Sequence, residues 1–387
     1  MKNRTIIFFE ISDYSLLRFP KRIAEEYCRN NLDVQFVFAY LYKYSQENIN
    51  FKIFPKNSHF TYLRGNISKI DTIFLNYPQA TVFTFALRPP EFYLVNSAKK
   101  MELKTIILQH GVLIPFMKRN VSYFVKEGKK MFFYFKSILL LSLKTKMSSL
   151  KCFREVFSIY ILGSKKLSQS VFVKKLNVLP DSVYVYSKYW KDFFILNYGF
   201  SPNQFNCIGS PDLEIYDSII TQKREDAVCY ICQTLVEDGR LSKRDFLLFI
   251  NAFGNSLKPT HDLYLKLHPR SELELYQQLT KRKNTFLVKE NTPNCTKYVG
   301  HYSTLISLPL NITANVFLWE FKGHEIPEYF SKATGYIGSS ELELREFISN
   351  ENEAPAFKEV LEYYFHYPGT RPFEEIYKLT EKQQIQS

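Results

Sequence analysis

The 387-residue sequence lacks the features that would send a protein out of the cytoplasm. The apolar run before Glu10 is only four residues long, which is too short for the core of a secretory signal. The run from 131 to 143 is broken by Lys136, and no other run reaches the roughly 18 residues of a membrane span. We therefore expect a cytoplasmic protein.

Cysteine is scarce, and its pattern excludes a disulfide framework. The six cysteines are scattered, at 28, 152, 207, 229, 232 and 295. Cys229 and Cys232 have the spacing of zinc ligands, but they lie in a predicted buried strand, and no second Cys/His pair accompanies them. We interpret both as core residues. No Asp-x-Asp stands at a predicted strand end to hold a metal, so we expect no metal site. We also expect no cofactor.

Acidic residues are nearly absent from one stretch of this basic chain. The whole sequence has 51 Lys and Arg against 38 Asp and Glu, a net charge of +13. Residues 118–175 hold 14 basic and 2 acidic residues, so 14 − 2 = +12 of that surplus lies there. Aromatic residues interleave with the charges over 115–160, which suits either an interfacial helix on an anionic membrane or a core helix with a solvated basic face. Nucleic acid fits less well, because the RRM and zinc-finger patterns are missing.

Short apolar runs alternate with helical patterns along most of the chain, which predicts doubly wound parallel sheets. The chain is too long for one ordinary core. We expect an N-terminal Rossmann-like domain over 1–204, a second over 205–350 and closing helices over 351–387. Strands are expected at 5–9, 33–39, 72–75, 80–85, 104–110, 182–187, 227–233, 262–267, 285–288 and 315–319.

One predicted strand, Leu263–Leu267, runs into a cluster of basic residues. Ligands on open parallel sheets bind outside the carboxyl ends of the strands, so Lys266, His268 and Arg270 are placed to face an anion. Further on, Ser303 and Thr304 precede an apolar run and are expected near a helix N-cap, where free N–H groups suit a phosphate. The alternative is that the His-Pro pair only forms a turn and that Ser303 and Thr304 only cap a helix, without binding a ligand. The order and spacing of the two together predict a phosphate site.

A second histidine lies at the end of a predicted strand. The strand 104–110 ends in Gln109-His110, with Gly111 permitting a sharp turn. His110 is well placed for proton transfer, because the unperturbed pKa of histidine lies near neutrality. The alternative is a core histidine that is hydrogen-bonded to the backbone.

Three short motifs now carry a family resemblance. Glu237-Asp238-Gly239, His268-Pro269 and Ser303-Thr304 resemble the motifs shared by bacterial sialyltransferases and polysialyltransferases, mainly over 205–310. The resemblance implies the GT-B fold, in which two Rossmann-like domains with parallel sheets face each other across a cleft. It also implies an inverting, metal-independent transferase that moves a sialic acid or related nonulosonic acid from a CMP-sugar to a lipooligosaccharide or capsule acceptor.

The resemblance also distributes roles among residues. His268 would lie near the phosphate, with Ser303 and Thr304 holding it. The other residues that we place on the donor side are Gly209, Ser210, Gly239, Lys266, Pro269, Arg270 and His301. Gln109 and Gly111 would lie on the acceptor side. The partners would be the CMP-sugar, a glycan or glycolipid acceptor and the anionic inner-membrane surface, with peripheral association there.

The chain departs from the family in one place. In several of these enzymes the acidic motif lies at a strand end of the N-terminal domain, where this chain has Gln109-His110-Gly111. That sequence looks more like the teichoic-acid polymerases that use CDP-glycerol, and it is also similar to capsule enzymes that use CMP-Kdo. The donor therefore stays open, and so does the base. His110 competes with Glu237 and Asp238, and we favour His110. A non-catalytic polyanion-binding or membrane-binding protein is the alternative from another class.

Overall fold

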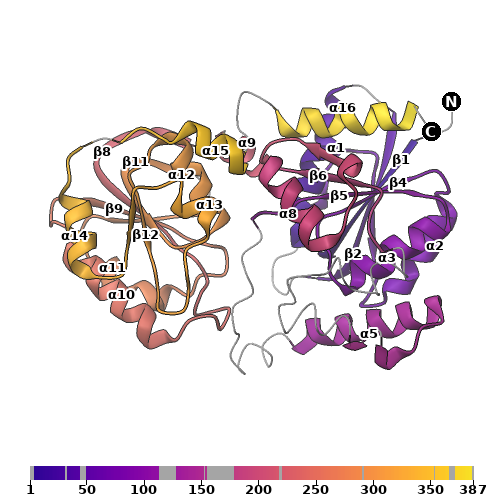
Figure 1. Ribbon diagram of the computed structural model, residues 1–387, viewed down its shortest axis with the longest axis horizontal. Coiled ribbons are helices and arrows are strands. Elements are labelled where there is room, and N and C mark those ends of the chain that lie inside the picture. Colours follow the sequence, from indigo (N-terminus) through magenta and orange to yellow (C-terminus); the bar gives the residue numbers. More distant parts are fainter. Residues whose placement is uncertain are drawn as a thin grey trace. The chain divides into compact units, whose positions relative to one another are not determined.

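The computed structural model describes residues 4–30, 33–43, 49–112, 128–151, 153–154, 178–217, 220–289, 292–352, 354–365 and 371–385. Its contacts separate the chain into two compact units. The first contains Met1–His110, Gly128–Pro211 and Gly369–Ser387, and the second contains Gly111–Glu127 and Asp212–Pro368. Figure 1 shows that each unit is a sheet with helices around it. The last segment of the chain belongs to the same unit as the first.

In the described part of the first unit, seven strands form one parallel sheet. They are β1 (Arg4–Ser12), β2 (Val34–Tyr42), β3 (Ser58–Tyr62), β4 (Thr81–Thr84), β5 (Lys104–Leu108), β6 (Ser182–Val185) and β7 (Phe205–Cys207). Their order across the sheet is β3-β2-β1-β4-β5-β6-β7. The run Ile6 to Phe9 in β1 is completely buried, as expected where helices cover both faces of a parallel sheet.

Helices cover both faces of this first sheet. They are α1 (Phe19–Arg29), α2 (Ile70–Asn76), α3 (Pro89–Lys100), α5 (Gly128–Thr145), α8 (Lys188–Tyr198) and α16 (Pro372–Ile385), with 3-10 turns at η1 (Tyr14–Leu17), η2 (Phe51–Ile53), η3 (Ile67–Lys69) and η5 (Pro202–Gln204). Ile7 and Phe9 of β1 enter a core shared with Phe92 of α3 and Ile138 of α5. Prolines lie in the first turns of α1 and α3, where a missing N–H costs nothing.

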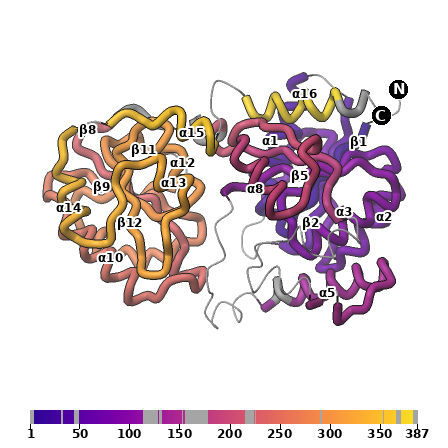
Figure 2. The backbone as a smooth tube through the Cα atoms, viewed as in Figure 1, coloured from indigo at the N-terminus to yellow at the C-terminus, as the bar shows by residue number. Residues whose placement is uncertain are grey.

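The last helix, α16, packs on the other face of the first sheet, beside α1. The rings of Phe19 in α1 and Phe373 in α16 lie 6.3 Å apart, and Tyr27 and Tyr377 make a similar pair at 5.0 Å. Figure 2 shows this helix running along α1. The end of the chain thus stabilises the unit in which the chain begins.

The described residues of the second unit form a six-stranded parallel sheet in the order β10-β9-β8-β11-β12-β13. The strands are β8 (Ile220–Ile231), β9 (Asp262–Lys266), β10 (Thr285–Val288), β11 (Thr292–Gly300), β12 (Val316–Trp319) and β13 (Tyr336–Gly338). The helices are α9 (Pro211–Asp217), α10 (Lys243–Ser256), α11 (Gln277–Thr280), α12 (Ser307–Ile312), α13 (Glu328–Ser331), α14 (Glu341–Ser349) and α15 (Lys358–Phe365), with 3-10 turns at η6 (Leu273–Tyr276) and η7 (Thr304–Ile306).

Each sheet has one point at which the strand order reverses. In the first sheet β1 lies between β2 and β4, and in the second β8 lies between β9 and β11. Ligands of doubly wound sheets bind in the crevice outside the carboxyl ends of the strands at such a point. We therefore expect a ligand site on the segments that follow β1, β4, β5, β8, β9 and β11.

The expectation of two parallel α/β sheets is confirmed, and most expected strands are present. The strand expected at 72–75 is wrong, because these residues lie in α2, and a short apolar run does not distinguish a strand from a buried helix. Strands β3, β7, β11 and β13 were not expected. Cys229 and Cys232 are buried, as predicted. Within the described ranges, no helix combines the length and apolar character needed to cross a membrane.

Candidate functional site

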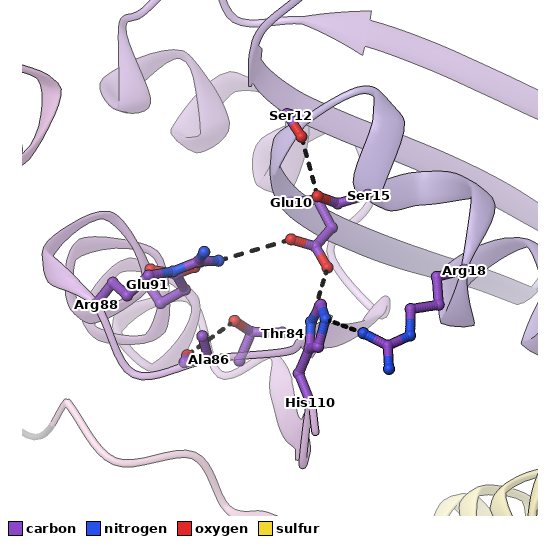
Figure 3. A network of polar contacts seen from close by, with 9 residues as sticks. All are labelled: Glu10, Ser12, Ser15, Arg18, Thr84, Ala86, Arg88, Glu91 and His110. Carbon is purple, nitrogen blue, oxygen red and sulfur yellow. Dashed lines mark hydrogen bonds and ion pairs between the residues drawn. The ribbon is translucent and has the colours of Figure 1, made fainter. Parts of the chain in front are cut away.

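A cluster of charged side chains lies at the switch point of the first sheet (Figure 3). Glu10 comes from the end of β1, Arg88 precedes α3 just after β4, and His110 follows β5. Arg18, the N-cap residue of α1, completes the cluster. In Figure 3 the side chains of Glu10 and Arg18 point toward His110, and Arg88 points toward Glu10 from the other side. Residues far apart in the sequence thus meet where a doubly wound sheet binds its ligand.

The imidazole of His110 is held between a cation and a carboxylate. Arg18 Nη1 lies 2.6 Å from His110 Nε2, and Glu10 Oε1 lies 3.9 Å from His110 Nδ1. Because a guanidinium only donates hydrogen bonds, Nε2 must be the acceptor and must carry no proton. The ring is therefore neutral, with its proton on Nδ1 facing Glu10. A neutral imidazole of this tautomer can accept a proton at Nε2.

The pKa values of Glu10 and His110 are shifted in opposite directions. Burial raises the pKa of Glu10 to about 7, although Arg88 pulls it down. Burial lowers the pKa of His110 well below its ordinary value, and the charges of Arg18 and Arg88 lower it further. His110 is therefore neutral near pH 7, while Glu10 is poised between its two states. Perturbed titratable groups at a strand-end crevice are typical of catalytic sites.

The two arginines of the cluster have different surroundings. Arg88 donates to Glu91 through Nε at 2.7 Å and also lies 3.6 Å from Glu10. Arg18 is partly exposed and its guanidinium carbon lies 4.6 Å from the ring centre of Phe19. Arg88 is thus held in place by two carboxylates, whereas Arg18 covers Nε2 of His110. A substrate hydroxyl can reach that nitrogen only after Arg18 shifts.

The two neighbours of His110 support its position. Gln109 is buried, and its Oε1 accepts the backbone N–H of Tyr186 at 3.0 Å, which ties the end of β5 to the end of β6. Gly111 has φ +73°, a backbone conformation that favours glycine, so the expected sharp turn is confirmed. Both residues shape the strand end that presents His110.

The second sheet has its own cluster at its switch point, and it joins two of the motifs. Arg270 grips Asp238 with both terminal nitrogens, at 2.6 and 3.3 Å, and Arg240 lies 3.4 Å from the same carboxylate. Thr234 donates to Asp238 at 3.1 Å. Burial raises the pKa of Asp238, but the arginines outweigh it, so the net shift is downward. An ionised Asp238 held in this way is a poor base, but it joins the loop after β8 to the loop after β9.

Further hydrogen bonds join the three loops of this second cluster. Glu237 Oε1 accepts the backbone N–H of Glu272 at 3.0 Å, and burial raises the pKa of Glu237. Gln233 Oε1, just after β8, accepts the backbone N–H of Tyr302 at 3.3 Å. The loops that follow β8, β9 and β11 are therefore connected. Gly239 has φ +64°, so the tight return of the first loop favours glycine there.

His268 stands in an exposed turn directly after β9. Its Nδ1 accepts the backbone N–H of Arg270 at 3.1 Å, and Ser271 caps the turn by accepting the N–H of His268 at 3.1 Å. Because Nδ1 is an acceptor, the ring proton of the neutral form lies on Nε2. His268 is therefore prepared to donate to a phosphate oxygen. Pro269 lies in the same exposed turn.

Ser303 is the N-cap of η7 and accepts the N–H of Leu305 at 3.3 Å, which confirms the expected cap, and Thr304 is the first residue of that turn. Lys266 is buried and donates from Nζ to the carbonyl of Lys289 at 2.6 Å, so its ammonium lies at the end of the neighbouring strand β10. Gly209 and Ser210 lie between β7 and α9, where Gly209 has φ +82° and Ser210 is buried. They belong to the first unit, with the His110 cluster.

His301 has a different environment from the other predicted donor residues. It is fully buried, Nε2 lies 3.0 Å from the hydroxyl of Tyr230, and Nδ1 lies 3.1 Å from the carbonyl of Trp319. Burial lowers its pKa to about 4. Because both ring nitrogens contact groups of the protein, His301 supports the loop after β11 from within the core.

The sequence did not single out Glu10, Arg18 or Arg88. Each lies close to a strand end, but only the strand order, with β1 next to β4, brings them to His110. The signals that could have found them were a carboxylate at the end of an otherwise apolar strand and an arginine before Pro89-Pro90. Of the basic stretch 115–160, residues 115–127, 152 and 155–160 lie outside the described residues.

No family model matches the chain, and comparison with curated protein sequences gives no match. Solved structures do match. A putative UDP-N-acetylglucosamine 2-epimerase from Listeria monocytogenes superposes with TM-score 0.58 at 8% identity, covering 100% of this chain and 98% of that one. UGT71G1 from Medicago truncatula with UDP-glucose gives 0.54 at 8%, covering 99% of each. The wall teichoic acid polymerase TagF gives 0.55 at 14%, covering 98% and 89%. The chain therefore has the GT-B fold.

Proposed function

We propose that this protein is an inverting transferase that moves a sialic acid or related nonulosonic acid from a CMP-sugar to a surface glycan. The acceptor would be lipooligosaccharide or capsule. The observation that carries the proposal is the convergence of the loops after β8, β9 and β11, joined by the bonds from Asp238 to Arg270 and from Gln233 to Tyr302. These loops hold the three motifs that resemble the sialyltransferases.

The second cluster suits the nucleotide phosphate of the donor. His268 carries its proton on Nε2 in the neutral form, and donation to the departing phosphate would favour cleavage of the bond to the sugar. The helical turn that begins at Ser303 offers backbone N–H groups to the same anion. Asp238 and Arg270 would hold the loops in register, and Glu237 would orient a hydroxyl of the donor or acceptor. In this mechanism the phosphate charge is met by protein donors.

The first cluster suits the acceptor. A hydroxyl that attacks the anomeric carbon must lose its proton, and the neutral ring of His110 has an unprotonated Nε2 that can accept it. Glu10 faces Nδ1 at 3.9 Å and, when ionised, would stabilise the imidazolium that forms. A carboxylate on the far side of a base from the reacting proton is also found in the Ser-His-Asp triad, where it stabilises the imidazolium. Arg18 would first leave Nε2 and could then contact the acceptor.

A CDP-glycerol-dependent polymer transferase is the second candidate. It is favoured by the structural match to wall teichoic acid polymerase TagF, which includes a form soaked with CDPG at TM-score 0.51 and 12% identity. The His-Gly sequence at 110 and 111 points the same way. A CMP-Kdo transferase would use the same cytidine chemistry.

A donor panel distinguishes these candidates. Purified protein is incubated with CMP-Neu5Ac, CMP-Kdo or CDP-glycerol and a lipid-linked glycan extract, and free CMP and labelled acceptor are measured. The proposal expects CMP release and transfer with CMP-Neu5Ac. Transfer only from CDP-glycerol or only from CMP-Kdo would replace the donor. Release from none of the three would favour a non-catalytic polyanion-binding or membrane-binding protein.

A further inference from the structure

Helix α5 is fixed to the first unit by one of its faces. Tyr134, Ile138 and Leu141 are buried in the core beneath the first sheet. Lys144, in the last turn, lies 2.8 Å from the carboxylate of Asp71 and also covers the ring of Tyr93. Figure 1 shows α5 on the outside of this unit, beside α3. These contacts therefore fix which face of α5 packs against the first unit.

The opposite face of α5 is also apolar, but it is exposed. The exposed fractions are 63% for Phe132, 44% for Phe135 and 74% for Leu143. At about 100° per residue these three side chains fall within an arc of roughly 80°, on the other side of the helix from Tyr134 and Ile138. The half-buried Leu139 lies within the same arc. A stripe of this kind differs from the scattered apolar residues that every protein surface carries.

Exposed basic side chains continue from the end of this stripe. Lys146, Lys151 and Arg154 are all exposed, and Leu150 between them is 79% exposed. They belong to the 118–175 stretch with its surplus of +12. Large aromatic and aliphatic side chains flanked by lysine and arginine are typical of helices that lie in the headgroup region of an anionic bilayer. A soluble polyanion would use the charges but would leave the apolar stripe in water.

We propose that the outer face of α5, formed by Phe132, Phe135, Leu139 and Leu143, docks into the surface of an anionic membrane. Lys146, Lys151 and Arg154 would contact the lipid phosphates beside it. The inference does not depend on the transfer reaction, because it concerns a surface that the two clusters do not use. It gives the first unit a fixed lipid-facing side.

The test is co-sedimentation of the full chain with vesicles of phosphatidylcholine, with or without phosphatidylglycerol. The wild type should bind the vesicles that contain phosphatidylglycerol, and added salt should weaken the binding. Phe132→Ser/Leu143→Ser should reduce partitioning at least about tenfold, because two large apolar side chains lose their lipid contacts. Lys146→Gln/Lys151→Gln/Arg154→Gln should reduce it as well.

The chain offers a matched control for the apolar variant. Leu196 on α8 and Leu342 on α14 are 74% and 65% exposed, so Leu196→Ser/Leu342→Ser removes similar apolar surface elsewhere. The control should bind vesicles like the wild type. Equal loss in both double variants, equal wild-type binding to vesicles without phosphatidylglycerol, or no binding to either would overturn the proposal. So would self-association that Phe132→Ser/Leu143→Ser abolishes in a chain that does not bind lipid, because the stripe would then be an interface between copies.

Discussion

The replacement of Glu10 by glutamine tests whether the first cluster works as a carboxylate-assisted base. The substitution keeps the size of the side chain and removes its negative charge. Glu10 is almost fully buried and its pKa is raised to about 7, whereas the pKa of His110 lies well below 6.5. Between pH 6 and 8 the group of this pair that changes charge is therefore Glu10.

The magnitude follows from these values. If ionised Glu10 stabilises the imidazolium of His110, kcat should rise with pH through about 7 and fall about tenfold per pH unit below it. In Glu10→Gln this rise should vanish, and kcat at pH 8 should drop by up to about 10⁴, the loss seen when the carboxylate beside a catalytic histidine is replaced by an amide. The assay is the transfer rate at saturating donor and acceptor between pH 5.5 and 8.5, the two limits being about 1.5 units either side of that pKa.

Glu237→Gln is the control, because the pKa of Glu237 is also raised by burial but the residue belongs to the second cluster. This variant should keep the rise near pH 7. If Glu10→Gln kept it and Glu237→Gln lost it, the reasoning about the first cluster would be refuted. Melting temperatures of both variants show whether each is folded at the pH of the assay.

Three further predictions follow. His268→Ala should reduce transfer by about 10²–10⁴ with an unchanged melting temperature, because this exposed side chain adds little to the core, and a wild-type rate would end its role at the phosphate. Arg18→Gln should raise the pKa of His110, measured by NMR of its ring, because a nearby positive charge is removed, and an unchanged pKa would contradict the contact at Nε2. Glu10 should destabilise the fold as pH rises from 4.5 to about 7, since the folded state holds its proton more tightly than the unfolded chain. The loss is at most about 3 kcal/mol at 1.36 kcal/mol per unit, and Glu10→Gln should remove it from denaturation curves.

The fold could be predicted because several central strands, alternating with helical patterns, are strongly apolar. Residues such as Ile6 to Phe9 and Leu263 to Leu265 form continuous apolar runs, as a parallel sheet covered on both faces requires. The strands that were not expected lack this signal. Strand β3 is only partly buried and includes Ser58 and Thr61, and β11 begins with Thr292-Pro293. At these places pairing with neighbouring strands outweighs local propensity.

The site could be predicted only in part, for a related reason. His110 and His268 were predicted as site residues because each lies at the end of a recognisable strand. Glu10 and Arg18 could not be found in this way, because their role depends on β1 lying beside β4 in the finished sheet. Strand order is a long-range property, and a carboxylate at the end of a strand looks the same in the sequence wherever that strand lies.

The central claim is that His110 accepts the proton of the acceptor hydroxyl. The most direct test compares glycosyl transfer with donor hydrolysis in His110→Ala and in Glu237→Ala/Asp238→Ala. We expect His110→Ala to lose transfer at least about 100-fold while it still binds donor, because the base is missing and the phosphate cluster is intact. The acidic double variant should weaken donor use and keep the ratio of transfer to hydrolysis. Full transfer by His110→Ala would contradict the account and would assign the base to the acidic pair.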